Sequence, residues 1–111
     1  MTEPANPDLP NEDTTLTANA LKAMAHPLRW KILCTLGERE LSVGEIVEQT
    51  GTSQSNISQH LEQLRNKNIV LSRKDANRIY YRIRNRQLLD LIGTMREVLC
   101  RVNLDDRSAQ D

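Results

Sequence analysis

Residues 52–65, TSQSNISQHLEQLR, decide the fold of this chain. At about 100° per residue, Ile57, Leu61 and Leu64 fall within roughly 40° of one another, which predicts a helix with one narrow buried stripe. The outward face carries mainly glutamine, serine and asparagine instead of the lysine and glutamate of an ordinary solvated helix. Short amide and hydroxyl side chains suit hydrogen bonds to base edges in a major groove. The segment therefore has the pattern of a DNA recognition helix.

A shorter helix is predicted just before this segment. Ser42 and Glu45 have the spacing of a capping box, in which each side chain bonds to the other residue's backbone N–H. Gly51 stands where the end of a helix needs a positive φ, and Thr52 or Ser53 can cap the next helix. A helix, a short glycine-containing turn and a polar helix make a helix-turn-helix. The alternative on these residues is an αα-hairpin in a small helical bundle.

Two β-rich segments follow at 69–74 and 79–84, joined by the polar turn 75–78, and predict a hairpin. The stretch 65–86 holds eight basic residues and one acid, Asp75, while many other acids gather at the two ends of the chain, so the formal net charge of +0 hides a positive region. The basic residues are Arg65, Lys67, Arg73, Lys74, Arg78, Arg82, Arg84 and Arg86. Local positive potential steers binding to phosphate. The hairpin is therefore predicted to be a wing along a DNA backbone, with a solvated hairpin as the alternative.

The helix predicted at about 86–102 carries apolar residues at spacings of four, three, four and three, which is a coiled-coil seam. The seam residues are Leu88, Ile92, Met95, Leu99 and Val102. No later element could cover this seam, which favours a homodimer. The alternative is packing onto the chain's own first helix, predicted at 14–25, and both arrangements could hold.

The 111 residues suffice for one domain with a modest core, which aliphatic side chains must build because aromatics are only 3%. The predicted fold is mainly α with a small β-hairpin: a winged helix-turn-helix of five helices over 14–102, with a further helix at 27–37 and the wing before the last helix. Disordered tails are predicted at 1–13, which is acidic and contains prolines, and at 103–111. No apolar run suits a membrane span or a signal peptide, so a cytoplasmic protein without a membrane partner is expected.

Three strings resemble the ArsR/SmtB family: LKAMAHPLR at 21–29, ELSVGE at 40–45 and SQSNISQHL at 53–61. Together with the order of elements, the resemblance covers about 14–102 and implies a bacterial, dimeric winged-helix repressor that releases DNA on sensing a stimulus. The first and last helices would hold the dimer, which adds Leu16 to the seam residues. Two recognition helices would then enter successive major grooves of an inverted-repeat operator, one DNA turn or ~34 Å apart.

The predicted DNA contacts divide between base edges and backbone. The base-reading residues lie on the polar face of the recognition helix: Gln54, Ser55, Ser58 and Gln59. The residues predicted to fix that helix on phosphates are Thr52, Ser53 and His60. The wing residues predicted to contact the backbone or minor groove are Arg73, Lys74, Asn77 and Arg78.

A metal site is not expected. Arsenic and cadmium sensors of the family carry a Cys-x-Cys pair where this chain has Ser42 and Gly44. The zinc-type site uses Asp, His and Glu ligands on the last helix, where this chain has Asp90 and Glu97 but no histidine. Carboxylates alone are poor ligands for a soft or borderline metal. The sequence therefore predicts no metal, no cofactor and no enzymatic activity.

The two cysteines, Cys34 and Cys100, fall on the second and last helices. Their placement resembles the thiol-sensing branch of the family, which implies that reactive sulfur species or an oxidant links them and releases the DNA. Arg96 and Arg101, near Cys100, could favour a thiolate. The alternatives are a metal-responsive repressor and a non-sensing regulator in which each cysteine is a small buried hydrophobe.

Overall fold

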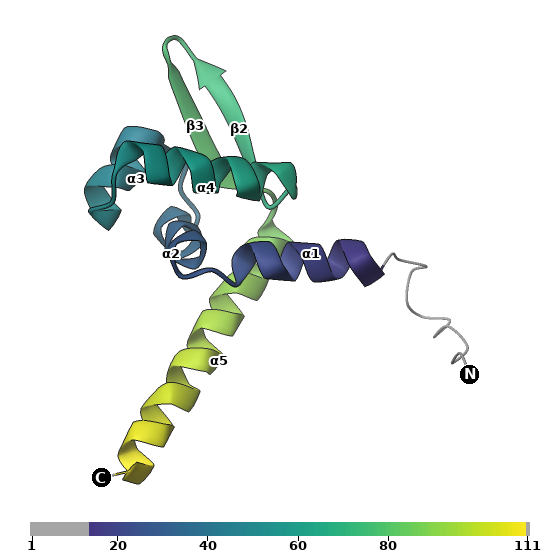
Figure 1. The fold of residues 1–111 in the computed structure, drawn as a ribbon, viewed down its shortest axis with the longest axis vertical. Helices are drawn as coiled ribbons and strands as arrows, with labels where there is room; N and C mark the ends of the chain where they lie inside the picture. Colours follow the sequence, from purple (N-terminus) through teal and green to yellow (C-terminus); the bar gives the residue numbers. More distant parts are fainter. Residues whose placement is uncertain (1–13, 111) are drawn as a thin grey trace.

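The computed structural model describes residues 14–110, with side chains from 14 to 100, so the predicted tail at 1–13 lies outside the described residues. In chain order the elements are α1 (Thr14–Met24), α2 (Pro27–Leu36), β1 (Leu41–Ser42), α3 (Val43–Thr50), α4 (Gln54–Asn66), β2 (Val70–Asp75), β3 (Arg78–Ile83) and α5 (Arg86–Gln110) (Figure 1). The predicted five helices with a hairpin before the last are confirmed. The predicted end of the last helix at 102 is wrong, because the backbone of α5 stays helical to Gln110, inside the segment expected to be a disordered tail.

The helix-turn-helix begins and ends where the sequence supplies caps. Ser42 and Glu45 form the predicted capping box at the start of α3. Gly51 ends α3 with a φ of 73°, a left-handed conformation that glycine adopts without a steric penalty. Ser53 then opens α4 by accepting a hydrogen bond from the Asn56 N–H at 3.3 Å. These local bonds set the angle at which α4 leaves the turn.

The core is aliphatic, and its centre is the stripe predicted on α4. The largest side chains with no exposed surface are Ile32, Leu33, Leu36, Ile46, Ile57, Leu61, Leu64 and Val70. They come from α2, α3, α4 and β2, so the recognition helix packs on the core through its inner face alone. Its polar face is left for solvent or a partner.

The three strands form an antiparallel sheet in the order β1–β3–β2. In the predicted hairpin Val70 pairs with Ile83 and Asp75 with Arg78, and the hairpin projects away from the helices as a wing (Figure 1). The sequence did not predict β1, a two-residue strand too short to show alternation, in which Leu41 pairs with Tyr81. This short strand ties the base of the wing to the start of α3.

Helix α5 extends away from the rest of the fold (Figure 1). Part of its apolar seam is buried in the core of the same chain, and part is exposed. Ile92 is only 3% exposed and belongs to the core of its own chain, so its predicted place in a dimer interface is corrected. Leu88 and Met95 are half-buried against that core. Leu99 is 56% exposed, and Leu16 of α1 is 68% exposed. The side chain of Val102, the remaining predicted interface residue, lies outside the described side chains.

Candidate nucleic-acid interface

The predicted base-reading residues all lie on the exposed face of α4: Gln54, Ser55, Ser58 and Gln59. Ser53, which was predicted to contact phosphate, caps the helix: its Oγ accepts a hydrogen bond from the Asn56 N–H. The same Oγ lies 3.5 Å from Ser55 Oγ. Thr52 is half-buried in the turn before the helix. The remaining amides and hydroxyls of this face point outward with donors and acceptors to offer.

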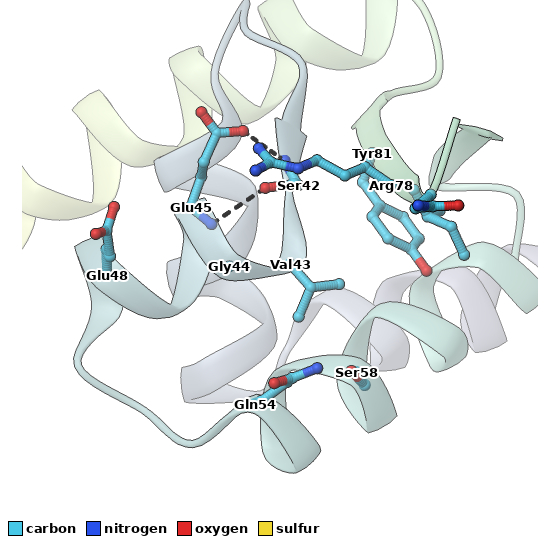
Figure 2. A pocket seen from close by; sticks show the side chains of 11 residues that line it. Ser42, Val43, Gly44, Glu45, Glu48, Gln54, Ser58, Arg78 and Tyr81 are labelled. Carbon is cyan, nitrogen blue, oxygen red and sulfur yellow. Dashed lines mark hydrogen bonds between the residues drawn. The ribbon is translucent and has the colours of Figure 1, made fainter. Parts of the chain in front are cut away.

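A cleft of about 650 Å³ lies between α3, the start of α4 and the tip of the wing (Figure 2). It brings Gln54 and Ser58 together with Asn77 and Arg78, four of the predicted DNA contacts. Tyr81 of β3 also lines the cleft, as does Glu48 of α3, which the sequence did not single out. The surface offered to a double helix is therefore concave and built from two elements that are distant in sequence.

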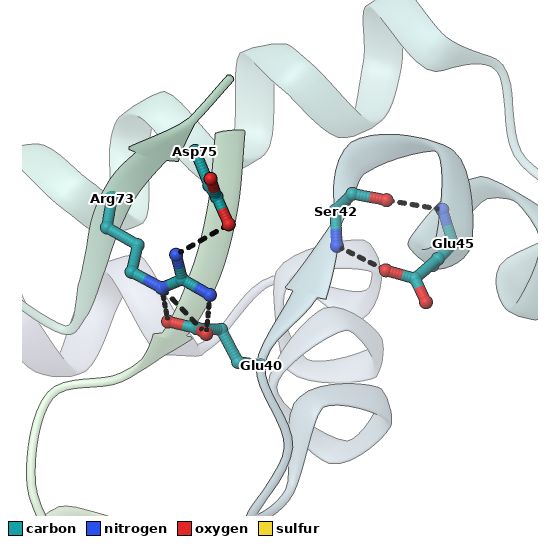
Figure 3. Close-up of polar contacts among 5 residues, drawn as sticks. All are labelled: Glu40, Ser42, Glu45, Arg73 and Asp75. Carbon is teal, nitrogen blue, oxygen red and sulfur yellow. Dashed lines mark hydrogen bonds and ion pairs between the residues drawn. The ribbon is translucent and has the colours of Figure 1, made fainter. Parts of the chain in front are cut away.

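Glu45 also lines this cleft, where a carboxylate would oppose phosphate. Its Oε1 accepts a hydrogen bond from the Ser42 backbone N–H at 2.9 Å (Figures 2 and 3). That bond, with a smaller contribution from the positive charge of Arg78, holds the pKa of Glu45 below its usual range. The carboxylate therefore stays ionised, and the capping hydrogen bond at the start of α3 stabilises its negative charge.

Arg73, one of the predicted DNA contacts, already has acidic partners in the structure. Its Nε lies 2.8 Å from Glu40 Oε1, its Nη2 lies 2.7 Å from the same oxygen, and its Nη1 lies 3.5 Å from Asp75 Oδ2 (Figure 3). The guanidinium also lies 4.9 Å from the centroid of the Tyr80 ring. The hydrogen bond from Arg73 lowers the pKa of Glu40. Arg73 therefore braces the wing against the segment that leads into β1.

The predicted positive region is narrower than the sequence suggests. Arg65 pairs with Glu62 at 2.9 Å, and Arg86 pairs with Glu38 at 3.6 Å and Asp90 at 3.3 Å. These acids lie outside the basic stretch in sequence, and folding brings them to it. Within the described side chains, Lys74 and Arg78 of the wing form no ion pair, although the charge of Arg78 acts on Glu45. The positive charge of the wing thus lies near its tip.

His60, predicted to contact phosphate, lies against a second histidine in the structure. Its ring centroid lies 4.5 Å from that of His26, and its Nδ1 is buried without a hydrogen-bond partner among the described residues. Burial lowers the pKa of His60, and the nearby His26 and Arg29 lower it further. The side chain therefore packs against the start of α2. The signal was available, because on the helical wheel His60 falls about 60° from Ile57, beside the buried stripe.

The two cysteines lie on α2 and α5, two helices that pack against each other. Both are free thiols, with Cys34 half-buried and Cys100 exposed. Burial raises the pKa of Cys34, the positive charge of Arg96 lowers it, and the Cys100 thiol raises it. Arg96 and Cys100 of α5 thus both affect the titration of Cys34, which lies 66 positions before Cys100 in the sequence.

Two absences concern the described residues only. No group of three or more histidine, cysteine, aspartate and glutamate side chains lies close enough there to hold a metal ion. Nor does that part of the chain contain a helix with the length and apolar character needed to cross a membrane.

A helix-turn-helix that presents a polar helix beside a hairpin with a basic tip is a winged-helix DNA-binding domain. The family model described as "Bacterial regulatory protein, arsR family" matches residues 26–72. The nodulation protein NolR of Rhizobium meliloti is 40% identical over 88 residues, which are 79% of this chain and 72% of NolR. The biofilm growth-associated repressor of Xylella fastidiosa is 35% identical over 104 residues, with 90% of this chain and 91% of that protein covered.

The structure of HlyU from Vibrio cholerae is 36% identical and superposes with a TM-score of 0.73, covering 81% of this chain and 98% of HlyU. The chain belongs to the ArsR family. It is a DNA-binding transcriptional regulator and not an enzyme.

Proposed function

We propose that this chain is a dimeric repressor that leaves an inverted-repeat operator when reactive sulfur species or an oxidant links Cys34 to Cys100. The observation that supports the proposal is that α2, which carries Cys34, packs against α5, which carries Cys100, so two thiols 66 positions apart in sequence lie on helices in contact. The relatives include a protein named for repression, the biofilm growth-associated repressor.

On the DNA side, Gln54, Ser55, Ser58 and Gln59 read base edges. Glutamine can pair bidentately with adenine, and serine with several acceptors. Thr52 lies beside the phosphates at the start of α4, while Lys74, Asn77 and Arg78 hold the backbone beside the cleft. This surface serves one half-site per protomer.

The second half-site requires a second protomer, and one end of the fold offers a surface for it. An apolar groove of about 480 Å³ lies between the α1–α2 turn and α5, with Trp30 and Met95 in its lining. Leu21 and Leu99 line this groove and are exposed, and Leu16 and Leu91 are exposed on the same two helices, α1 and α5. Exposed apolar surface of this kind marks an interaction site, because its burial is favourable by roughly 25 cal/mol per Å². A second copy of α1 and α5 would cover it about a twofold axis.

The chemistry uses the different environments of the two thiols. Cys100 is exposed, so a reagent in solution reaches it first. The raised pKa of Cys34 keeps it mostly protonated at neutral pH until it attacks the modified Cys100. With peroxide, two thiols become one disulfide, and their two electrons and two protons reduce the peroxide to water. With a polysulfide, the Cys100 thiolate attacks one of its sulfurs, which breaks an S–S bond, leaves a chain of sulfurs on Cys100 and releases hydrosulfide or a shorter polysulfide. The Cys34 thiolate then attacks that chain, forming the bridge and expelling its terminal sulfur as hydrosulfide.

The link would reach the DNA through α2. This helix packs against α3 and α4 as well as α5, so a bond from Cys34 to Cys100 acts on the support of the recognition helix. A coupling free energy of about 1–3 kcal/mol weakens operator binding about 5–150-fold. That loss is sufficient to relieve repression.

The test is fluorescence anisotropy with an inverted-repeat duplex chosen by selection from a random-sequence library. Wild type should lose affinity after polysulfide or peroxide treatment, while Cys34→Ser and Cys100→Ser should keep it, and mass spectrometry reports whether sulfur atoms are added. The single tryptophan, Trp30, lies between α2 and α5 and gives an independent fluorescence signal. The link should form faster as pH rises, because more Cys34 is then thiolate. A Cys34→Ser protein that still releases DNA on treatment would refute the two-thiol mechanism.

A further inference from the structure

A small hollow of about 190 Å³ lies between α1, α2 and α4, and we call it the basic hollow. Helix α1 runs alongside α4 here, and the wing rises from the other side of α4 (Figure 1). The polar lining consists of three cations and two amides, with no acid: Lys22, Arg29, Lys67, Asn19 and Gln63. Among the described side chains, none of the three cations has an acidic partner. The hollow is therefore a concentration of unmatched positive charge.

Helix ends account for two of these cations but not for the third. Lys22 lies in the last turn of α1 and Lys67 at the C-terminal cap of α4, where cations interact favourably with the final carbonyls. Arg29 lies in the first turn of α2, at the positive end of that helix, where a cation is unfavourable. Its Nε is also buried without a hydrogen-bond partner in the described part of the chain. An unmet buried donor is costly, and Arg29 stands beside two further cations, so the charge of this site favours an anionic occupant.

The position of the hollow on α4 indicates where that anion comes from. On the helical wheel Ser55 and Gln59 point outward, toward the floor of a major groove. Ser58 lies on the flank that borders the wing cleft, and Gln63 lies on the opposite flank, at the hollow. A helix in a major groove about 12 Å wide runs between two phosphodiester strands. The wing therefore faces one strand and the basic hollow faces the other.

We propose that the basic hollow binds a backbone phosphate of the DNA strand opposite the one that the wing contacts. This inference rests on the proposed operator binding and adds a second phosphate site to each protomer. Lys22 and Lys67 are exposed and supply charge, Asn19 and Gln63 supply amide hydrogen bonds, and Arg29 adds a third positive charge in the wall of the hollow. The volume holds several water molecules of about 30 Å³ each, so a phosphate group fits.

The first test measures operator affinity against salt for Lys22→Gln and Lys67→Gln. Each lost phosphate contact changes the log–log slope by about 0.9, so a dimer that loses two should have a slope less negative by about 1.8. Operator and scrambled duplexes should weaken by the same factor, because phosphates carry no sequence information. Arg86→Gln is the matched control, since Arg86 already pairs with Glu38 and Asp90. An unchanged slope in both lysine variants, with wild-type operator binding intact, overturns the inference and leaves the proposed function standing.

The second test needs no DNA. The positive charge of Arg29 helps to lower the pKa of His60. An anion bound in the hollow should offset that charge, so inorganic sulfate should raise the pKa of His60. Proton NMR follows the titration of His60 and the adjacent His26 in sulfate and in chloride of equal ionic strength. Arg29→Gln should abolish the effect of sulfate, and if that variant does not fold, Lys67→Gln should weaken it. No saturable effect in wild type overturns the inference. A sulfate effect without any change in the DNA salt slope assigns the hollow to small anions and overturns the DNA assignment.

Discussion

Two regions of the molecule differ in how far they bury their apolar side chains. One is the reading unit, made of α3, α4 and the wing, and the other is the α1–α5 end. In the reading unit Ile46, Ile57 and Leu61 have no exposed surface. At the α1–α5 end Leu16 is 68% exposed and Leu99 is 56% exposed. Both regions have helical apolar periodicity in the sequence. The difference shows that a periodic stripe marks a face that will be buried, but not whether the same chain or a second copy buries it.

The largest effect is expected in the reading unit. Leu61→Ala removes a fully buried side chain at the centre of the core and should lower the free energy of unfolding by about 2–5 kcal/mol. Urea unfolding followed by circular dichroism measures the change. Gln59→Ala, on the exposed face of the same helix, is the control and should change stability by less than about 0.5 kcal/mol. Equal losses in both variants would mean that α4 is not anchored by one face.

At the α1–α5 end a change should break assembly and leave the fold intact. Leu99→Asp puts a charge on the exposed seam, so the protein should stay helical but sediment as a monomer. Because one half-site then binds alone, affinity for the inverted repeat should fall by more than about tenfold, the equivalent of 1.4 kcal/mol. Leu99→Met keeps the surface apolar and should remain dimeric. A Leu99→Asp protein that stays dimeric would place the interface elsewhere.

The sequence was sufficient for features that depend on local spacing. The stripe and polar face of α4, the capping box of Ser42 and the hairpin all follow from residues that are close along the chain. It was insufficient where the partner is remote. The residues next to Arg73 in sequence do not indicate that Glu40 will pair with it. The ring contact of His60 with His26 likewise joins residues that are far apart in sequence. Ile92 was misassigned for the same reason, since its partners lie in the core of its own chain.

Within the wing, Arg78 and Arg73 should differ in their effect on the salt dependence of operator binding, and this effect is smaller than the two above. Arg78→Ala should make the salt slope of operator binding less negative by about 1.8 for the dimer, because each protomer loses one phosphate contact. Arg73→Ala should leave the slope unchanged, because Glu40 and Asp75 already match that charge. Anisotropy titrations over a range of salt concentrations compare the two variants. Equal changes in slope would show that Arg73 leaves Glu40 when DNA binds.

The smallest effect is expected at the tip of the wing, where Ala76 has a φ of 55°. A residue with a Cβ pays roughly 1–2 kcal/mol in this left-handed region, and glycine avoids that cost but loses about 0.5–1 kcal/mol of chain entropy. Ala76→Gly should therefore stabilise the protein slightly, by up to about 1 kcal/mol in urea unfolding. Gly51→Ala is the reciprocal change, because Gly51 has a φ of 73° and open space where a Cβ would lie, so it should destabilise through the backbone alone. If both substitutions shift stability in the same direction, the strain is not in the backbone of the turn. The reading unit would then contain a compensating contact at Ala76 that glycine cannot make.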